Sequence, residues 1–272
     1  MGSLRLEREQ DAGDGKGFIF RTVSDNLKVL TTDKKLVDRY NGRRVWKIGV
    51  SVASGCGVGC VYCFTNTYSR VRQLLAEEMI GQAEFVLGLP ENCGTAGSFD
   101  EIKISFKQMG DPALNPHQTC EAIRVLHEHH PDFLYVVSTS APKKPQLFWG
   151  LGNLVRSGVN IRLQFSCHTT SDEERKVLSP KLSMMSFDGI AEVVRNWPGE
   201  RVTLNFVVMK GRAYDAKALR QLFDPGKVFV KVNYLDPNSQ LAKFGLEDQT
   251  KEEVSAFTQA LAAEGFTYAF RH

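Results

Sequence analysis

The sequence organises around one stretch, Trp46-Lys47-Ile48-Gly49-Val50-Ser51-Val52-Ala53-Ser54-Gly55-Cys56-Gly57-Val58-Gly59-Cys60-Val61-Tyr62-Cys63. Its first half is apolar and rich in β-branched residues, which predicts a strand over Trp46–Ala53. Its second half is a glycine-rich loop that carries three cysteines at the spacing Cys-x3-Cys-x2-Cys. Glycines let such a loop turn tightly, so the three thiols can converge on one object. We therefore predict a metal centre directly after this strand.

Downstream of the cysteines, apolar strands alternate with helical segments. Further strands are predicted at Glu101–Lys107, Phe133–Thr139, Val159–Phe165, Val202–Val208, Val228–Leu235 and Tyr268–Phe270. Helices are predicted at Arg70–Leu87, Pro116–His130, Lys144–Arg156, Phe187–Asn196, Ala213–Phe223 and Lys251–Glu264. This alternation is typical of parallel βαβ units, in which ligands bind at the carboxyl ends of the strands.

We therefore expect an α/β fold, a partial (β/α)6 TIM-like barrel, with a doubly wound sheet as the alternative. The barrel is expected to occupy residues 45–272. Residues 1–44 are more polar and are expected to form a short N-terminal extension, a hairpin or cap.

Composition disfavours several classes of protein. The 272 residues include 34 Lys+Arg and 31 Asp+Glu, and this near balance lacks the basic excess typical of nucleic-acid-binding proteins. No run approaches about 18 consecutive apolar residues, and the N-terminus lacks the apolar core of a signal peptide. We expect a cytoplasmic protein without a membrane span. In that reducing compartment, clustered cysteines favour metal binding over disulfides.

The clustered cysteines, Cys56, Cys60 and Cys63, suit a [4Fe–4S] cluster in which one iron keeps no protein ligand. The alternative is a structural zinc site. A structural zinc ion is normally bound by four protein ligands, commonly in two pairs. No second Cys/His pair at zinc-finger spacing occurs in the sequence. The spacing therefore favours an iron–sulfur cluster.

The cysteine spacing, with the aromatic Tyr62 before the last cysteine, is similar to the signature of the radical S-adenosylmethionine (SAM) superfamily. Further motifs resemble, in order, those of one branch, the radical RNA methyltransferases that methylate adenine in ribosomal and transfer RNA. They are Ser51–Cys56, Glu78–Gln82, Met109–Asn115 (with Asp111 for the branch's Glu), Val137–Ser140, Ser166–His168 and Lys231–Asn238. The resemblance runs from about Trp46 to Tyr268.

The resemblance implies SAM contacts near the ends of the strands. The implied cofactor-binding residues are Tyr62, Gly110, Asp111, Ser138, Ser166, His168 and Asn238. Gly110 and Asp111 are expected at the methionine amino group, and Asn238 at the nucleoside. Ser166 and His168 match the branch's ribose and carboxylate contacts, and strand alternation predicts that both point into the barrel.

The resemblance also implies a reaction. An electron from the reduced cluster cleaves SAM into methionine and a 5′-deoxyadenosyl radical, which abstracts hydrogen from a substrate. The protein supplies position, orientation and exclusion of water. An electron donor such as flavodoxin or ferredoxin is the implied partner.

Two features depart from the branch. Its members carry a cysteine seven residues before the first cluster cysteine, where this chain has Gly49. They carry a methyl-bearing cysteine near the C-terminus, whereas Cys167 is the last cysteine here and the chain stops at His272. Methyl transfer through methyl-cysteine is therefore not expected. With little room before Trp46 for an RNA-binding domain, RNA is not the favoured partner.

We therefore predict a radical SAM enzyme that acts on a small, anionic or nucleotide-like substrate. Lys103, Ser105 and Lys107 share one strand face, and Lys231 shares one with Asn233. Inward lysines would favour an anionic substrate, and pairing with acidic residues is the alternative explanation. The other function hypotheses are an RNA-modifying radical SAM enzyme and a non-catalytic iron–sulfur or zinc-binding protein.

Overall fold

The computed structural model describes residues 2–11, 13–38 and 42–271. The chain forms two compact units. The first unit comprises Met1–Cys56, Tyr68–Ser138 and Gln146–Ile161. The second unit comprises Gly57–Thr67, Thr139–Pro145 and Arg162–His272.

The first unit begins with three antiparallel strands that continue into a parallel sheet. In sheet order the strands are β1 (Leu4–Asp11), β2 (Lys16–Thr22), β3 (Lys28–Val37), β4 (Arg44–Val50), β7 (Glu101–Phe106) and β8 (Leu134–Thr139). The antiparallel pairing extends from β1 to β4, and the β4–β7 and β7–β8 pairs are parallel. The sequence suggested only a hairpin or cap here, and the expected domain boundary at residues 44 and 45 stays a prediction.

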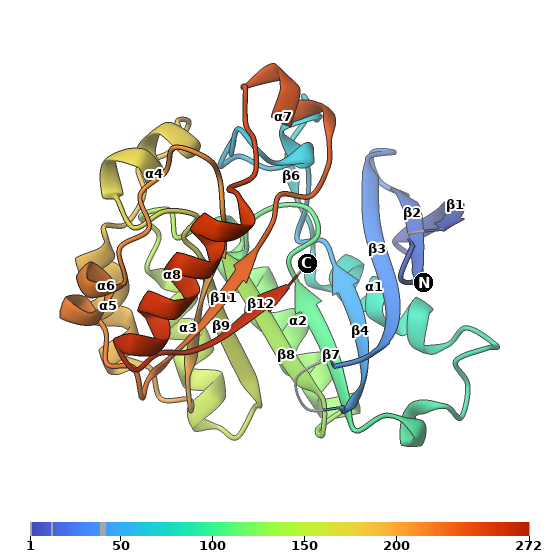
Figure 1. The fold of residues 1–272 in the computed structure, drawn as a ribbon. Coiled ribbons are helices and arrows are strands. Elements are labelled where there is room, and N and C mark those ends of the chain that lie inside the picture. The colour runs from blue at the N-terminus through green and yellow to red at the C-terminus, as the bar shows by residue number, and fades with distance from the viewer. Residues whose placement is uncertain (1, 12, 39–41, 272) are drawn as a thin grey trace. The chain divides into compact units, whose positions relative to one another are not determined.

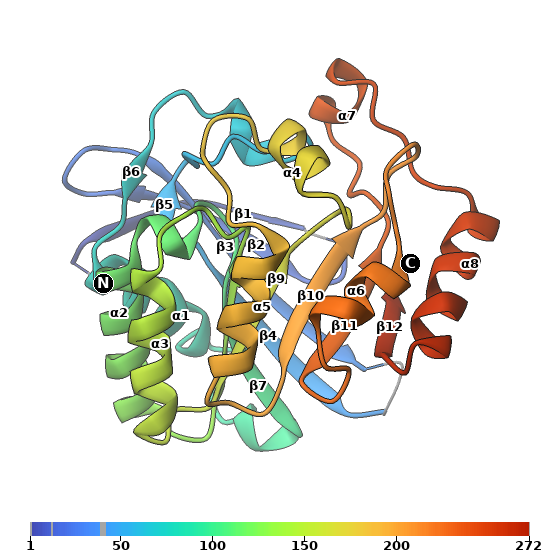
Figure 2. The same ribbon diagram turned by 90° about the vertical axis from the view of Figure 1, so that its left-hand side faces the viewer.

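Three helices pack on one another in the first unit, and Figure 2 shows them together. They are α1 (Ala76–Leu87), α2 (Pro116–His129) and α3 (Gln146–Arg156). The predicted helix at Arg70–Leu87 begins six residues late, because Arg72 and Gln73 form the short strand β6 against β5 (Ala53–Ser54). Gln82 of α1 then fixes the chain before the cysteine loop: its side-chain amide accepts from Ser51 N at 2.9 Å and donates to Ser51 O at 3.1 Å.

The second unit contains four parallel strands that pair in chain order (Figure 1). They are β9 (Ile161–Ser166), β10 (Val202–Val207), β11 (Val228–Asn233) and β12 (Thr267–Arg271). The helices are α4 (Asp172–Leu178), α5 (Phe187–Asn196), α6 (Ala216–Leu222), α7 (Ser239–Lys243) and α8 (Lys251–Ala263). Strands that alternate with helices in both units confirm the predicted α/β class with a parallel sheet.

The strands of the second unit have two chemically different faces. One face buries apolar side chains such as Phe165, Leu204 and Val230. The opposite face is polar and includes Gln164, Ser166, Asn205, Lys231 and Asn233. Successive side chains of a strand point to opposite faces of the sheet. The alternation of apolar and polar residues therefore gives the sheet one apolar, buried face and one polar face.

Sequence patterning missed the helix α4. Its seven residues carry too many charges to show an apolar stripe. A local signal was available, because Ser171 and Glu174 have the Ser-x-x-Glu spacing of a helix start, and the Ser171 side chain accepts from Glu174 N at 3.3 Å. In the part of the chain that the structure describes, no helix is both long enough and apolar enough to cross a membrane.

Candidate functional site

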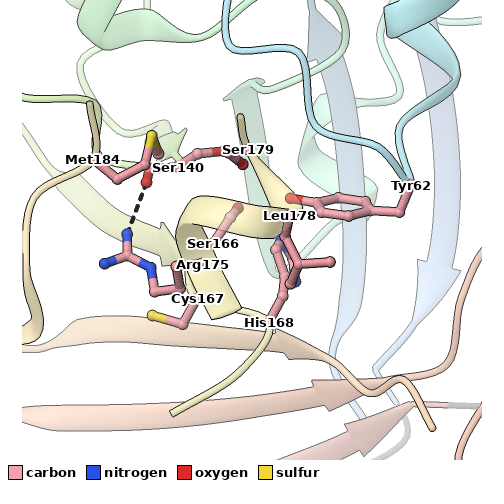
Figure 3. Close-up of a pocket in the computed structure, with 9 residues that line it drawn as sticks. All are labelled: Tyr62, Ser140, Ser166, Cys167, His168, Arg175, Leu178, Ser179 and Met184. Atoms are coloured by element: carbon pink, nitrogen blue, oxygen red, sulfur yellow. Dashed lines mark hydrogen bonds between the residues drawn. The ribbon is translucent and has the colours of Figure 1, made fainter. Parts of the chain in front are cut away.

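A small pocket lies in the second unit, close to the carboxyl end of β9 (Figure 3). It encloses about 190 Å³, counting its open mouth. Its polar lining comes from Tyr62, Ser140, Ser166, His168, Arg175 and Ser179. The structure thus brings together three residues that the resemblance implied, Tyr62, Ser166 and His168.

His168 reaches the pocket through an unusual backbone conformation. Strand alternation was the wrong reason for its orientation, because β9 ends at Ser166 and His168 has a left-handed φ of 63°. Its ring lies edge-on to Tyr62, with ring centroids 4.6 Å apart. The backbone N–H of Val207 donates to Nδ1 at 3.0 Å, so the neutral ring carries its proton on Nε2. A non-glycine residue held in this conformation is typical of functional sites.

Burial, with a smaller contribution from the Arg175 guanidinium, lowers the pKa of His168 to about 3. An unfolded chain binds this proton near pH 6.5. The neutral, buried His168 therefore contributes its full stability above about pH 6.5, and that contribution falls progressively as the pH drops from 6.5 toward 3. The loss should be at most about 1.4 kcal/mol per pH unit. Urea unfolding at pH 7 and pH 5 should show a smaller pH dependence in His168→Gln, whereas exposed His117→Gln should retain it. An unchanged slope in His168→Gln would contradict this assignment.

Arg175 of α4 is a pocket residue that the sequence analysis did not find. Only 4% of its side chain is exposed. Its Nη1 donates to Met185 O at 2.6 Å, and its Nη2 donates to Ser140 O at 3.0 Å, the bond drawn in Figure 3. Its guanidinium also lies over the Phe187 ring, 5.1 Å from the centroid. One buried cation thus holds two separate loop segments of the second unit at the pocket.

The cysteine loop borders the same pocket through Tyr62, and the neighbouring Cys60 contacts two of the serines that line it. This thiol is 8% exposed, and its Sγ lies 3.2 Å from Ser179 Oγ and 3.8 Å from Ser140 Oγ. Burial raises the pKa of Cys60. A positively charged metal ion or cluster lowers the pKa of a coordinating thiol, so these hydroxyls are placed to donate to a bound thiolate.

A lysine closes over the cysteine loop. Gly59 has a φ of 74°, and a Cβ at this position would overlap the aliphatic stem of Lys181. The Lys181 ammonium donates to Asn66 Oδ1 at 2.9 Å, which ties down the turn after Cys63. Glycine suits residue 59 for two reasons: it adopts a left-handed φ readily, and it has no side chain to collide with Lys181.

The donor set of the loop fits the predicted cluster. All three cysteines are free thiols, and thiolates are the usual ligands of iron–sulfur clusters. Among the described residues, no group of three or more His, Cys, Asp or Glu side chains is arranged to hold a metal ion. Assignment of Cys56, Cys60 and Cys63 as ligands therefore rests on donor chemistry and spacing, and it stays a prediction.

Asn238 contacts the cysteine loop directly. Its Nδ2 donates to Tyr62 O at 3.2 Å and to Asp236 O at 2.8 Å. Its Oδ1 accepts from Gln240 N at 2.9 Å and so caps α7. The residue thus joins α7 to the cysteine loop within the second unit, and its expected nucleoside contact stays a prediction.

Gly110, Asp111 and Ser138 belong to the first unit. Gly110 has a φ of 86°, and a Cβ there would stand 2.7 Å from Ala53 Cβ, so glycine is required for packing against β5. The Asp111 side chain is buried and accepts from Ala113 N at 2.9 Å. Ser138 lies near the end of β8. The structure explains the turn at Gly110 and Asp111, and the SAM contacts of these residues stay predictions.

Gly49 also has a packing role in the first unit. Gln108 Nε2 donates to Thr32 Oγ1 at 2.6 Å, and a Cβ at Gly49 would overlap both side chains. A cysteine at this position would displace the Gln108 side chain. The side chains around Gly49 therefore fit a glycine at this position, where members of the branch carry a cysteine.

The lysines that suggested an anionic substrate have different environments. Lys103 forms an ion pair with Glu101, in agreement with the alternative explanation. Lys107 is exposed beyond the end of β7. Lys231 donates to Gln164 Oε1 at 3.2 Å. An anion-binding role for these lysines stays a prediction.

The chain is similar in sequence to RNA methyltransferases. No protein-family model matches the chain. The chain is 30% identical over 289 residues to the dual-specificity RNA methyltransferase RlmN of Wolinella succinogenes, covering 98% of this chain and 76% of the relative. It is 27% identical over 281 residues to a probable RlmN of Desulfitobacterium hafniense, covering 98% of this chain and 74% of the relative.

Solved structures give the same result. A radical SAM methyltransferase from Sphaerobacter thermophilus matches with a TM-score of 0.76 and 26% identity, covering all of this chain and 77% of that one. Methylornithine synthase matches with a TM-score of 0.55 and 18% identity, covering 85% of this chain and 66% of that one. At this identity the match supports the fold alone. These neighbours confirm the radical SAM TIM-like fold, an enzyme, and the predicted cofactors, since radical SAM enzymes use a [4Fe–4S] cluster and SAM. The chain belongs to the RlmN family of radical SAM RNA methyltransferases.

Proposed function

We propose that this chain is a radical SAM enzyme that modifies a nucleotide in RNA. The observation that carries the proposal is its alignment, over 98% of its length, with a dual-specificity RNA methyltransferase. This relationship favours the RNA-modifying alternative over the small-molecule substrate that the sequence suggested. The near-balanced charge remains compatible with RNA, because base and shape contacts also contribute to RNA recognition.

Within this proposal, Cys56, Cys60 and Cys63 hold the iron–sulfur cluster. When bound, the cluster supplies the electron that cleaves SAM into methionine and a hydrogen-abstracting 5′-deoxyadenosyl radical. Tyr62, Gly110, Asp111, Ser138, Ser166, His168 and Asn238 bind SAM. The electron donor is a flavodoxin or ferredoxin.

The pocket residues suit this role because they limit access to water and fix polar groups. His168 is 5% exposed and Ser179 is also 5% exposed. The neutral His168 offers an Nε2–H donor beside the Tyr62 ring, and Arg175 holds the carbonyl of Ser140. Fixed dipoles in a pocket with little water interact strongly with a polar ligand.

Gly49 bears on the type of modification. The Gln108 and Thr32 side chains occupy the space beside it, which disfavours a thiol at this position. We therefore propose that the hydrogen abstracted by the radical comes directly from the RNA nucleotide.

The test compares RNA with small anions as substrates. Anaerobically reconstituted enzyme is incubated with SAM, dithionite and unmodified ribosomal or transfer RNA transcripts, and 5′-deoxyadenosine is quantified. We expect RNA to accelerate its release at least about tenfold, and deuterium from labelled RNA to enter 5′-deoxyadenosine. Matched DNA and nucleoside monophosphates serve as controls. Stimulation by a monophosphate and none by RNA would return the function to the small-substrate hypothesis.

A further inference from the structure

Asn115 is a buried residue of the first unit that has no role in the proposed function. It ends the Met109–Asn115 motif and immediately precedes helix α2. The residue is only 6% exposed. Its Nδ2 donates to Val52 O at 3.0 Å and to Leu74 O at 2.8 Å. Both N–H donors of this amide therefore bind backbone carbonyls inside the protein.

The two carbonyls belong to opposite sides of the short ribbon that leads to the first cysteine. Ala53 of β5 pairs with Gln73 of β6, and Val52 and Leu74 are their immediate neighbours in the chain. Leu74 N donates to Val52 O at 3.0 Å, which closes the ribbon at this end. Strand β5 ends two residues before Cys56. Asn115 thus bridges both sides of the ribbon that carries a predicted cluster ligand.

The start of the same motif is also fixed to this ribbon. Met109 O accepts from Val52 N at 2.8 Å and from Ala53 N at 3.2 Å. The motif is therefore tied to the ribbon at both ends, through the backbone of Met109 and through the side chain of Asn115. The turn between these two ties contains the proposed SAM contacts Gly110 and Asp111.

We propose that Asn115 is a positioning residue, which holds the Gly110–Asp111 turn in a fixed place relative to the start of the cysteine loop at Cys56. Because the cluster reacts with SAM, the cluster ligand and the SAM contacts must keep one relative position. A misplacement of about 1 Å in a reacting complex can cost about a hundredfold in rate. The inference rests on the proposed roles of Cys56, Gly110 and Asp111.

Removal of the Asn115 amide should change this position as well as the stability. Val52 O and Leu74 O would both lose a hydrogen-bond donor in the interior of the first unit. A buried carbonyl without a partner is unfavourable, and it regains one when water enters. Water can enter here if the ribbon and the start of α2 separate. That separation would move the Gly110–Asp111 turn away from the cysteine loop.

Asn115→Leu tests the inference, because leucine is similar in size and donates no hydrogen bond. The full chain is reconstituted anaerobically with iron and sulfide. The probe is S-adenosylhomocysteine, which has the amino group of SAM but no sulfonium that the cluster could cleave. Calorimetry measures its affinity, and electron paramagnetic resonance of the reduced cluster measures the spectral shift on its addition. We expect the affinity to fall at least about tenfold and the shift to diminish.

Two neighbours on α2 provide the controls. Gln118 Oε1 accepts from Ala76 N at 2.8 Å, so Gln118→Leu removes a hydrogen bond between α2 and α1 and leaves the ribbon intact. The buried Thr119 hydroxyl has no hydrogen-bond partner in the part of the chain that the structure describes, so Thr119→Val removes no bond. Both variants should bind S-adenosylhomocysteine like the wild type. Urea unfolding compares the stabilities of all variants.

A second substitution covers the case in which Asn115→Leu does not fold. Asn115→Ser replaces it, because the serine hydroxyl can donate to one of the two carbonyls. This variant should show a smaller loss of affinity than leucine would cause, and it should still bind more weakly than Gln118→Leu and Thr119→Val.

Weaker binding in the folded Asn115 variant, with wild-type binding in Gln118→Leu, supports the positioning role. Loss of iron from the folded Asn115 variant also supports it, since Cys56 would then be displaced. Wild-type affinity, spectrum and iron content would overturn the inference and leave Asn115 as a packing residue. An equal loss of affinity in Gln118→Leu would overturn it too, because lowered stability would explain the effect. A wild type that assembles no cluster would contradict the proposed function, and the inference with it.

Discussion

Replacement of Cys60 by alanine is expected to abolish assembly of the iron–sulfur cluster. Three thiolates hold three of four irons, and removal of one leaves the cluster with two protein ligands. The position left empty is buried and lies against the Ser179 hydroxyl. After anaerobic reconstitution, iron and sulfide content should fall from about four per chain to near zero. The brown chromophore and the release of 5′-deoxyadenosine should disappear with them.

The matched control is Cys93→Ala. Cys93 is also a free thiol, but it is exposed and lies outside the cysteine loop. This variant should retain the iron content and the absorbance of the wild type. Wild-type iron content in Cys60→Ala would exclude Cys60 as a ligand. A colourless wild-type protein with one zinc per chain would favour the zinc alternative.

Replacement of Arg175 by methionine is expected to lower the free energy of unfolding by about 2–5 kcal/mol, because two carbonyls lose a charged hydrogen-bond donor. The guanidinium is almost fully buried and donates to the carbonyls of Ser140 and Met185. Methionine fills part of the space but donates no hydrogen bond, so both carbonyls lose this partner, and Asp172 loses its ion pair at 3.5 Å. Urea-induced unfolding followed by circular dichroism measures the effect.

Lys176→Met is the control for the Arg175 prediction, because Lys176 is the next residue of α4 and is exposed. Its effect should stay within about 0.5 kcal/mol. We also expect Arg175→Met to weaken binding of S-adenosylhomocysteine more than Lys176→Met does, since Ser140 borders the pocket. Equal stabilities of the two variants would show that Arg175 does not hold the loops together.

Patterns within short segments predicted most of the parallel fold. The helix Phe187–Asn196 has the predicted bounds because its apolar residues recur on one face and Ser186 caps its start. The strand at Val202 begins where β-branched residues resume. The cysteine spacing identified the superfamily, because it is a property of adjacent residues.

Other elements lack such a pattern. Strand β1 exposes nearly every side chain, so its sequence shows no alternation between buried and polar residues. Helix α4 is too short and too charged for an apolar face, although its cap was visible in the sequence. Arg175 was missed for the same reason, since a surface helix would place an arginine in solvent.

The amino-acid sequence alone was enough to predict the superfamily, the α/β class and the candidate thiol ligands. These features depend on hydrophobic period and on spacing within a few residues. Tertiary packing determined the rest. It turned His168 into the pocket, buried Arg175 beneath two loops, filled the space beside Gly49 with Gln108, and paired Asn205 with Asn233 across two strands. Each of these contacts joins residues whose separation along the chain leaves no local signal, because only the packed strands and loops bring them together.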